Sequence, residues 1–262
     1  MKAGKFVVVM DNEDRENEGD LIMAAEFATE ESVAFMLRHT TGIICAFNRP
    51  GHIFPLLAMD GGVLPVGYIC EMNDDMGRMM RRPQLEEFAV KYDLPLITIS
   101  DLIRYRVRTE TLVTRRSKKD ASVSSQVVTP HGQFAAFEYE SVISDSQSYE
   151  VLVYGDVAQQ ANVPVYFVEE GFVQSINAQW AQKHVVKHGA GILIYVNDSK
   201  KLLEISGKLM ARQSIFGMGM QIARDLQVAS VALLSTEDKF AFDPQGFGVK
   251  VTDVERLAIP SQ

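Results

Sequence analysis

The chain has 262 residues, of which 47% are hydrophobic and 23% charged, a composition that fits a globular protein and excludes a disordered or collagen-like one. Its formal net charge of −8 disfavours binding to nucleic acid phosphates or to anionic lipids. The length suits one large domain or two small ones, and we expect two.

The cysteine content and the first apolar run bear on the compartment. Cys45 and Cys70 are too few for a disulfide framework, so a reducing, cytoplasmic location fits better than secretion. The run from Val7 to Met10 ends at Asp11 and is too short for a signal sequence or a membrane span. We therefore expect a cytoplasmic protein that binds neither a membrane nor nucleic acid.

Strands and helices alternate in the first half of the chain. Phe6 to Met10 predicts a buried strand, and Thr29 is a good N-cap for a helix that Gly42 ends. Further along, we predict a strand at 68–72, a helix at 83–92, a strand at 96–99 and a helix at 100–105. This alternation indicates an α/β (α+β layered) core.

A basic segment separates this half from a second one. Six basic residues between positions 106 and 119 are followed by serines at 122, 124 and 125, which favours a solvated linker over a nucleic-acid site. Beyond it we predict strands at 133–139, 150–154 and 191–196, and a helix at 174–186. The expected organisation is an α/β domain at 1–107, a linker at 108–125 and a second α/β domain at 126–262.

The segment DNEDRENEGD at 11–20 directly follows the first strand and contains seven charged residues. Its position favours a site over a solvated turn, because ligand loops of layered α/β proteins follow their strands, and Gly19 would let the backbone approach a ligand. An EF-hand is excluded, since the sixth position lacks glycine and the twelfth lacks glutamate. Glu16, Glu18 and Asp20 could supply oxygens to Mg²⁺ while Arg15 binds an anionic group.

Five motifs appear in the order typical of one enzyme family. They are DRENEGDLI at 14–22, RHTTGIIC at 38–45, RPGHIFPL at 49–56, GGVL at 61–64 and ICEMNDD at 69–75. Over about residues 4–105 the chain resembles the 3,4-dihydroxy-2-butanone 4-phosphate synthases of riboflavin biosynthesis. This resemblance implies a homodimeric lyase that uses Mg²⁺ or Mn²⁺ and converts ribulose 5-phosphate, a phosphorylated sugar, to 3,4-dihydroxy-2-butanone 4-phosphate and formate.

The resemblance also implies roles for individual residues. His52, Glu71 and Glu18 would be catalytic, and Glu16 would bind the metal. The substrate would be bound by Arg15, Glu16, Asp20 and Glu71. Without the surrounding motifs, His52 would be read as a turn histidine and Glu71 as a paired structural carboxylate.

The family pattern is interrupted twice. At Ala46–Phe47 and at Leu64–Pro65 the family has further segments, and the second of them carries the histidine that completes its metal site. Either the sequence is joined across omitted segments, or the chain is a non-catalytic regulatory or binding protein that keeps the scaffold. We expect omission, with Cα–Cα separations above about 3.8 Å at both junctions, and further breaks at 170–171 and 196–200.

The second half resembles a GTP cyclohydrolase II domain. The motifs are GAGILIYV at 189–196, RQSIFGMGMQIARDLQV at 212–228, VALLS at 231–235 and GFGVKV at 246–251. That family binds zinc through three cysteines, whereas this half has no cysteine, and Phe216 stands where an active tyrosine is usual. The resemblance therefore implies a degenerate domain without zinc or cyclohydrolase activity, which serves packing, dimerisation or regulation.

Overall fold

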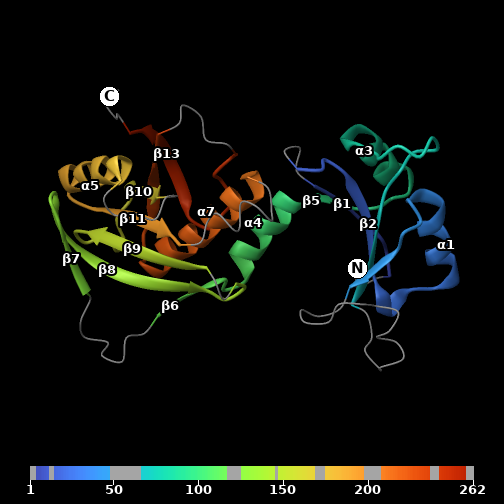
Figure 1. Cartoon of the computed structure of the whole chain (residues 1–262), viewed down its shortest axis with the longest axis horizontal. Helices are drawn as coiled ribbons and strands as arrows, with labels where there is room; N and C mark the ends of the chain where they lie inside the picture. Colours follow the sequence, from blue (N-terminus) through green and yellow to red (C-terminus); the bar gives the residue numbers. More distant parts are fainter. Residues whose placement is uncertain are drawn as a thin grey trace. The chain divides into compact units, whose positions relative to one another are not determined.

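The computed structural model describes residues 4–11, 15–47, 66–116, 125–144, 147–168, 175–197, 208–236 and 242–257. The chain divides into two compact units, Met1–Leu102 and Ile103–Gln262, each with its own β-sheet and helices (Figure 1). The expected α/β class is confirmed. Among the described helices, none is long and apolar enough to cross a membrane.

The first unit is built on a five-stranded sheet in the order β3-β4-β2-β1-β5. β1 and β5 are parallel, and the other neighbours are antiparallel. The strands are β1 (Val7–Met10), β2 (Gly19–Ala24), β3 (Cys45–Phe47), β4 (Gly67–Glu71) and β5 (Leu96–Thr98).

Two helices, α1 (Glu30–His39) and α3 (Arg82–Lys91), cover one face of this sheet (Figure 1). Alternate residues of β1 and β2 point into the core beneath them, because successive side chains of a strand face opposite sides. The core includes Val8, Met10, Leu21, Met23, Met36, Cys70, Leu85 and Phe88. Residues Asp20 and Ile22 of β2 therefore face the other side of the sheet.

The start of α1 is fixed as the sequence predicts. Thr29 Oγ1 accepts a hydrogen bond from Ser32 N at 3.2 Å, and Ser32 Oγ accepts one from Thr29 N at 2.8 Å. This reciprocal pair satisfies two backbone donors at the helix N-terminus. A short 3₁₀ helix, η1 (Ala25–Phe27), joins β2 to α1.

The second unit contains an eight-stranded mixed sheet in the order β13-β12-β10-β11-β9-β8-β6, with β7 also paired to β8. β10 to β13 are mutually parallel, and β6 to β9 are antiparallel to their neighbours. The strands are β6 (Val113–Arg115), β7 (Ser125–Thr129), β8 (Gly132–Ser141), β9 (Ser148–Tyr154), β10 (Val163–Val168), β11 (Gly191–Val196), β12 (Ser230–Ser235) and β13 (Lys250–Arg256).

Helices cover both faces of this sheet. α5 (Ile176–His188) packs with one set of strand residues, and α7 (Lys208–Asp225) packs with the alternate set (Figure 1). Leu193 thus belongs to the core under α5, whereas Ile192 and Ile194 belong to the core under α7. This alternation explains why β11 is apolar along its whole length.

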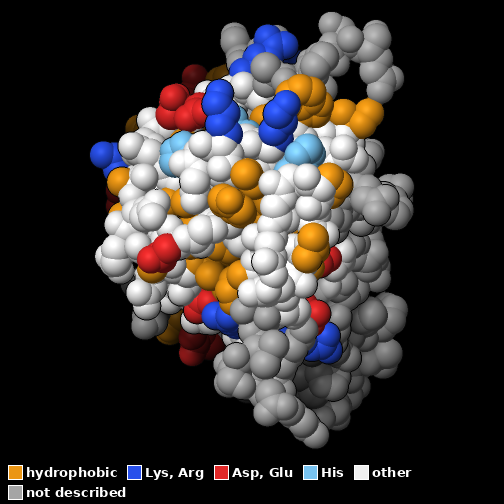
Figure 2. Space-filling view, turned by 90° about the vertical axis from the view of Figure 1, so that its left-hand side faces the viewer, with side chains coloured by type: hydrophobic (Ala, Val, Ile, Leu, Met, Phe, Trp, Pro, Cys, Tyr) orange, Lys and Arg blue, Asp and Glu red, His pale blue; other side chains and the backbone are white. Residues whose placement is uncertain are grey.

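The described part of the segment expected as a linker carries regular structure. α4 (Ile99–Thr109) is longer than predicted, and β6 follows it and pairs with β8. Arg115 stacks over the Phe137 ring, and Arg116 forms ion pairs with Glu138 and Glu140. On the face of the molecule shown in Figure 2, acidic and basic side chains also lie among scattered hydrophobic side chains.

The expected chain break at the first junction is wrong. Ala46 and Phe47 are consecutive residues of β3 and pair with Tyr68 and Gly67 of β4. The chain therefore runs directly from the RHTTGIIC motif into the edge of the sheet. The junction Leu64–Pro65 and the breaks expected at 170–171 and 196–200 fall on positions outside the described residues.

Candidate active site

The acidic segment forms the loop and the second arm of a β-hairpin. Asp11 N donates to Glu18 O at 2.9 Å, and Met10 pairs with Gly19 where β2 begins. The loop between the arms, residues 11–18, is called the acidic loop here, and the structure describes Asp11 and residues 15–18 of it. Asp20 therefore lies in a strand, not in the loop expected from the sequence.

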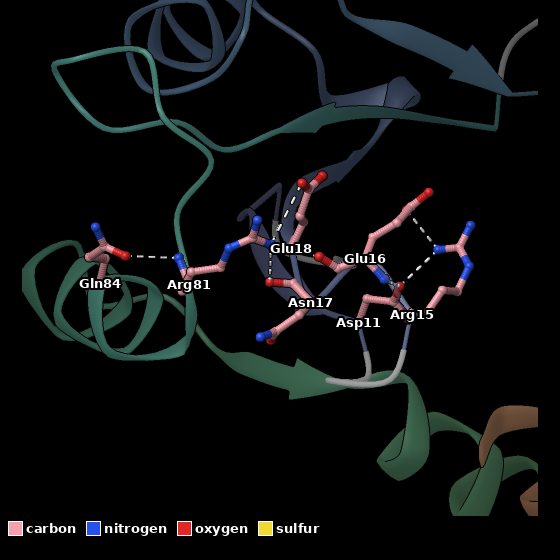
Figure 3. A network of polar contacts seen from close by, with 7 residues as sticks. All are labelled: Asp11, Arg15, Glu16, Asn17, Glu18, Arg81 and Gln84. Atoms are coloured by element: carbon pink, nitrogen blue, oxygen red, sulfur yellow. Dashed lines mark hydrogen bonds and ion pairs between the residues drawn. The ribbon is translucent and has the colours of Figure 1, made fainter. Parts of the chain in front are cut away.

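Arg15 is held by two carboxylates of the acidic loop (Figure 3). Its Nη1 donates to Asp11 Oδ2 and to Glu16 Oε2, both at 2.8 Å. The hydrogen bond to Asp11 is the largest cause of a raised pKa for Arg15. Asp11 is nearly buried and also accepts Glu16 N at 3.3 Å, so it anchors this end of the loop.

Two carboxylates lie side by side on one face of the sheet, on neighbouring strands. Asp20 of β2 pairs directly with Glu71 of β4, so their side chains project from the face opposite to α1 and α3. Burial raises the pKa of Asp20 to about 6, and the charge of Glu71 is the next largest cause, followed by those of Asp11, Glu16 and Glu18. Asp20 is therefore a carboxyl group that exchanges its proton close to neutral pH.

Arg81, just before α3, reaches the other end of the acidic loop (Figure 3). Its Nη1 donates to Glu16 O and to Asn17 O, both at 2.6 Å, and lies 3.6 Å from Glu18 Oε1. Asn17 has a φ of 52°, a left-handed conformation that Asn adopts more readily than most residues. The loop is thus held at both ends, by Asp11 and by Arg81.

Gly19 serves a different purpose from the one expected. A Cβ atom at this position would overlap Leu85 Cδ1 and Cδ2, so the glycine allows α3 to approach β2. The expectation that Gly19 brings the backbone close to a ligand is corrected accordingly. Leu85 is fully buried, and Arg81 precedes it by one helical turn.

The donor set suits a hard divalent cation in part. Asp20, Glu71, Glu16 and Glu18 offer carboxylate oxygens, the donors that Mg²⁺ and Mn²⁺ prefer, and a cation nearby would relieve the repulsion that raises the pKa of Asp20. Within the described ranges, however, no group of three or more His, Cys, Asp or Glu is arranged to hold a metal. Mg²⁺ commonly uses only one or two protein carboxylates and completes its shell with water and substrate oxygens.

The remaining expected residues fall in different places. His52 lies outside the described residues. Cys45 is exposed, and Cys70 is buried in the core of the first unit with its Sγ 3.6 Å from Thr41 Oγ1. Two residues that hold the acidic loop, Asp11 and Arg81, were not assigned roles from the sequence, although Asp11 is part of the DNEDRENEGD segment.

The family comparison covers most of the first unit. A family model described as 3,4-dihydroxy-2-butanone 4-phosphate synthase matches residues 1–47 and 62–105. These ranges include Glu16, Asp20, Glu71 and Arg81, whereas the RPGHIFPL motif with His52 lies between them.

Similarity to curated proteins extends over the whole chain. It is 28% identical to the chloroplastic bifunctional riboflavin biosynthesis protein RIBA 1 of Arabidopsis thaliana, with 96% of this chain and 66% of the relative covered. It is 27% identical to the riboflavin biosynthesis protein RibBA of Bacillus mycoides, with 100% and 92% covered. These alignments extend over 366 and 373 residues, more than the chain contains, so both relatives have segments that it lacks.

One solved structure matches both units. The crystal structure of RibBX from A. baumannii, described as a two-domain 3,4-dihydroxy-2-butanone 4-phosphate synthase, has a TM-score of 0.75 and 25% sequence identity, with 99% of this chain and 97% of that chain covered. The two-unit α/β architecture is therefore shared with a solved protein. Together with the family match over residues 1–47 and 62–105, it supports the similarity of the N-terminal unit to the 3,4-dihydroxy-2-butanone 4-phosphate synthases.

Proposed function

We propose that the N-terminal unit is a lyase that converts ribulose 5-phosphate to 3,4-dihydroxy-2-butanone 4-phosphate and formate, with Mg²⁺ or Mn²⁺ as cofactor. The observation that carries this proposal is the Asp20–Glu71 pair, in which two carboxylates share one face of the sheet next to the acidic loop. The reaction consists of proton transfers on a sugar ketone and a skeletal rearrangement, so it requires several acid and base groups around one carbon chain.

The titration of Asp20 suits this chemistry. Because its pKa is about 6, Asp20 is present in both protonation states near neutral pH and can accept or donate a proton. Glu71 is exposed on the neighbouring strand, on the same face of the sheet, and can bind the same substrate carbon chain. Glu18, at the end of the acidic loop, would join them in proton transfer.

Arg15 and Glu16 are proposed to bind the charged parts of the substrate complex. The Arg15 guanidinium is partly exposed, and a substrate phosphate can compete with the Glu16 carboxylate for it. Glu16 would then be free to hold the metal, which when bound polarises vicinal substrate oxygens. His52 is proposed as a further catalytic group on the strength of the RPGH motif alone.

Formate release tests this proposal directly. The full chain with ribulose 5-phosphate and Mg²⁺ is expected to release formate, and Glu71→Gln or Glu16→Gln should lower kcat/KM at least about 100-fold. Glu86→Gln is a matched control, because Glu86 pairs with Arg82 within α3. A folded wild-type chain that releases no formate would contradict the proposal and favour a non-catalytic binding protein.

For the second unit we propose a role in packing, dimerisation or regulation, without zinc and without GTP cyclohydrolase II activity. The supporting observation is that neither cysteine of the chain lies in this unit. The purified chain is expected to contain no stoichiometric zinc and to leave GTP unchanged. GTP turnover dependent on zinc would contradict this assignment.

A homodimer is proposed as the assembly of the chain, with a cytoplasmic location. Equilibrium sedimentation at micromolar concentration should give twice the mass of 29.2 kDa. A monomer under these conditions would contradict the proposed assembly.

A further inference from the structure

We infer that Arg81 is a positioning residue that clamps the acidic loop in the geometry needed for catalysis. This inference rests on the proposed function. It concerns a side chain that contacts the loop through Glu16, Asn17 and Glu18. Arg81 is therefore distinct from the groups proposed to bind the metal or substrate.

One nitrogen of Arg81 makes several contacts with the acidic loop. Arg81 Nη1 bonds two successive carbonyl oxygens, those of Glu16 and Asn17, and lies near the Glu18 carboxylate (Figure 3). Successive carbonyls of an extended chain point in opposite directions, and the left-handed backbone of Asn17 turns the two toward one donor. Hydrogen bonds from a charged donor are stronger than those from a neutral donor. Removal of the guanidinium therefore takes away the charged donor that holds the two carbonyl oxygens of this turn.

The backbone of Arg81 is itself fixed by the start of α3. Gln84 Oε1 accepts a hydrogen bond from Arg81 N at 2.8 Å, and Leu85 N donates to Arg81 O at 3.0 Å as α3 begins. One turn into the helix, Leu85 packs against Gly19, which is the first residue of β2. The start of α3 therefore holds the hairpin at two points, one apolar and one charged.

The contacts of Arg81 orient the side chains of Glu16 and Glu18. The Arg81 bonds involve the backbone of Glu16 and Asn17, so the side chains of Glu16 and Glu18 leave the loop in directions that Arg81 sets. Arg15, the residue directly before Glu16, is held by Asp11 at the start of the loop. Displacement of reacting groups by about 1 Å can lower a rate about 100-fold, so a small shift of this loop is sufficient to impair catalysis.

The test compares Arg81→Met, Arg81→Lys and the control Arg78→Met in the full chain. Arg78 is an exposed arginine of the preceding turn that pairs with Asp74, so its loss changes the net charge equally. We expect Arg81→Met to lower kcat/KM for formate release about 100-fold. Arg81→Lys should recover most of this loss, because a single ammonium nitrogen with three donors can serve both carbonyls.

Hydrogen exchange supplies a readout that does not depend on catalysis. In Arg81→Met, the backbone amides of residues 15–18 should exchange faster than in wild type, while those of β9 and β11 should not change. Unchanged loop exchange and unchanged kcat/KM in Arg81→Met would overturn the inference. So would equal defects in Arg81→Met and Arg81→Lys with a lowered unfolding midpoint, because this pattern indicates a merely structural role.

The inference and the proposed function fail in different ways. If the wild-type chain releases no formate, the proposed function fails, whereas selective acceleration of loop exchange in Arg81→Met still supports the clamp. If the wild-type chain is active and Arg81→Met matches Arg78→Met in both assays, the clamp is wrong and the proposed function stands.

Discussion

Asp20 of β2 lies directly opposite Glu71 of β4, on the face of the sheet that points away from α1 and α3. Burial of Asp20 and the nearby charge of Glu71 both disfavour its ionised form, and together with the acidic loop they raise its pKa to about 6. Carboxylates that face each other destabilise the folded state unless a proton or a cation is shared between them. The pair therefore weakens the fold at the position where the proposed chemistry occurs.

The first prediction follows from the sign of this shift. The pKa of Asp20 is about 6 in the folded state, above its ordinary value of 3.8, so the folded state binds more protons between these values. The stability that Asp20 contributes is present below pH 4 and is lost as the pH rises through 6. Asp20→Asn should therefore match wild type near pH 4 and be more stable by about 1 kcal/mol at pH 8, a value reduced by solvent screening.

Urea unfolding at several pH values measures this difference. Asp93→Asn is a suitable control, because Asp93 is fully solvated and pairs with Lys5. The change in its stability effect between pH 4 and 8 should be smaller than that of Asp20→Asn. A stability difference for Asp20→Asn that does not grow with pH would contradict the raised pKa.

The second prediction concerns the partner carboxylate. Glu71→Gln removes the largest charge that acts on Asp20, so the pKa of Asp20 should fall toward its ordinary value. A carboxyl NMR titration of Asp20 in the variant measures this change without reference to activity. Glu26→Gln, on the short helix after β2, provides the matched control. An unchanged Asp20 titration in Glu71→Gln would show that the charge of Glu71 does not contribute to the raised pKa.

Part of this arrangement is predictable from the sequence. The buried strand before the acidic segment, the N-cap of α1 at Thr29 and the strand around Cys70 follow from hydrophobic pattern and capping chemistry. The sequence also identifies Asp20 and Glu71 as candidate site residues. It does not show that they are cross-strand neighbours, because the register of β2 against β4 depends on packing between segments about fifty residues apart.

Other features were missed for identifiable reasons. β2 begins within a charged segment that reads as a loop, so its pairing with β1 was not predicted. β10 has Pro164 at its second position, and proline removes a backbone donor and argues against a central strand. The contact from Arg81 to the acidic loop joins residues more than sixty positions apart, which local patterns cannot predict.

The third prediction tests the close approach of α3 to the hairpin. Gly19→Ala places a methyl group against the fully buried Leu85 side chain and should lower the free energy of unfolding by roughly 1–3 kcal/mol. Leu85→Ala alone should cost roughly 2–5 kcal/mol because it leaves a cavity. Since the new methyl group fills part of that cavity, the double variant should be more stable than the sum of the single effects predicts.

A double-mutant cycle by urea unfolding gives this coupling. Additive effects within about 0.5 kcal/mol would mean that Gly19 and Leu85 do not compete for the same space. Gly77→Ala is a useful comparison, because its Cβ would meet nothing within 4 Å and the cost there arises only from a positive φ of 76°. The two glycines thus separate steric overlap from backbone strain.

The fourth prediction concerns the end of α4 in the second unit. Gln221 is buried on α7, and its Oε1 accepts a hydrogen bond from Leu112 N at 2.9 Å. Its Nε2 donates hydrogen bonds to Val107 O at 2.8 Å and to Glu110 O at 2.9 Å. The last carbonyls of a helix have no partner within the helix, so this one side chain satisfies groups that would otherwise be buried without hydrogen bonds. Gln221→Met keeps the volume similar and removes all three bonds, and it should lower the free energy of unfolding by roughly 2–4 kcal/mol. The control Gln126→Met, on the exposed side of β7, should change the free energy of unfolding by less than about 0.5 kcal/mol. An equally small effect of Gln221→Met would show that other groups or water satisfy the end of α4.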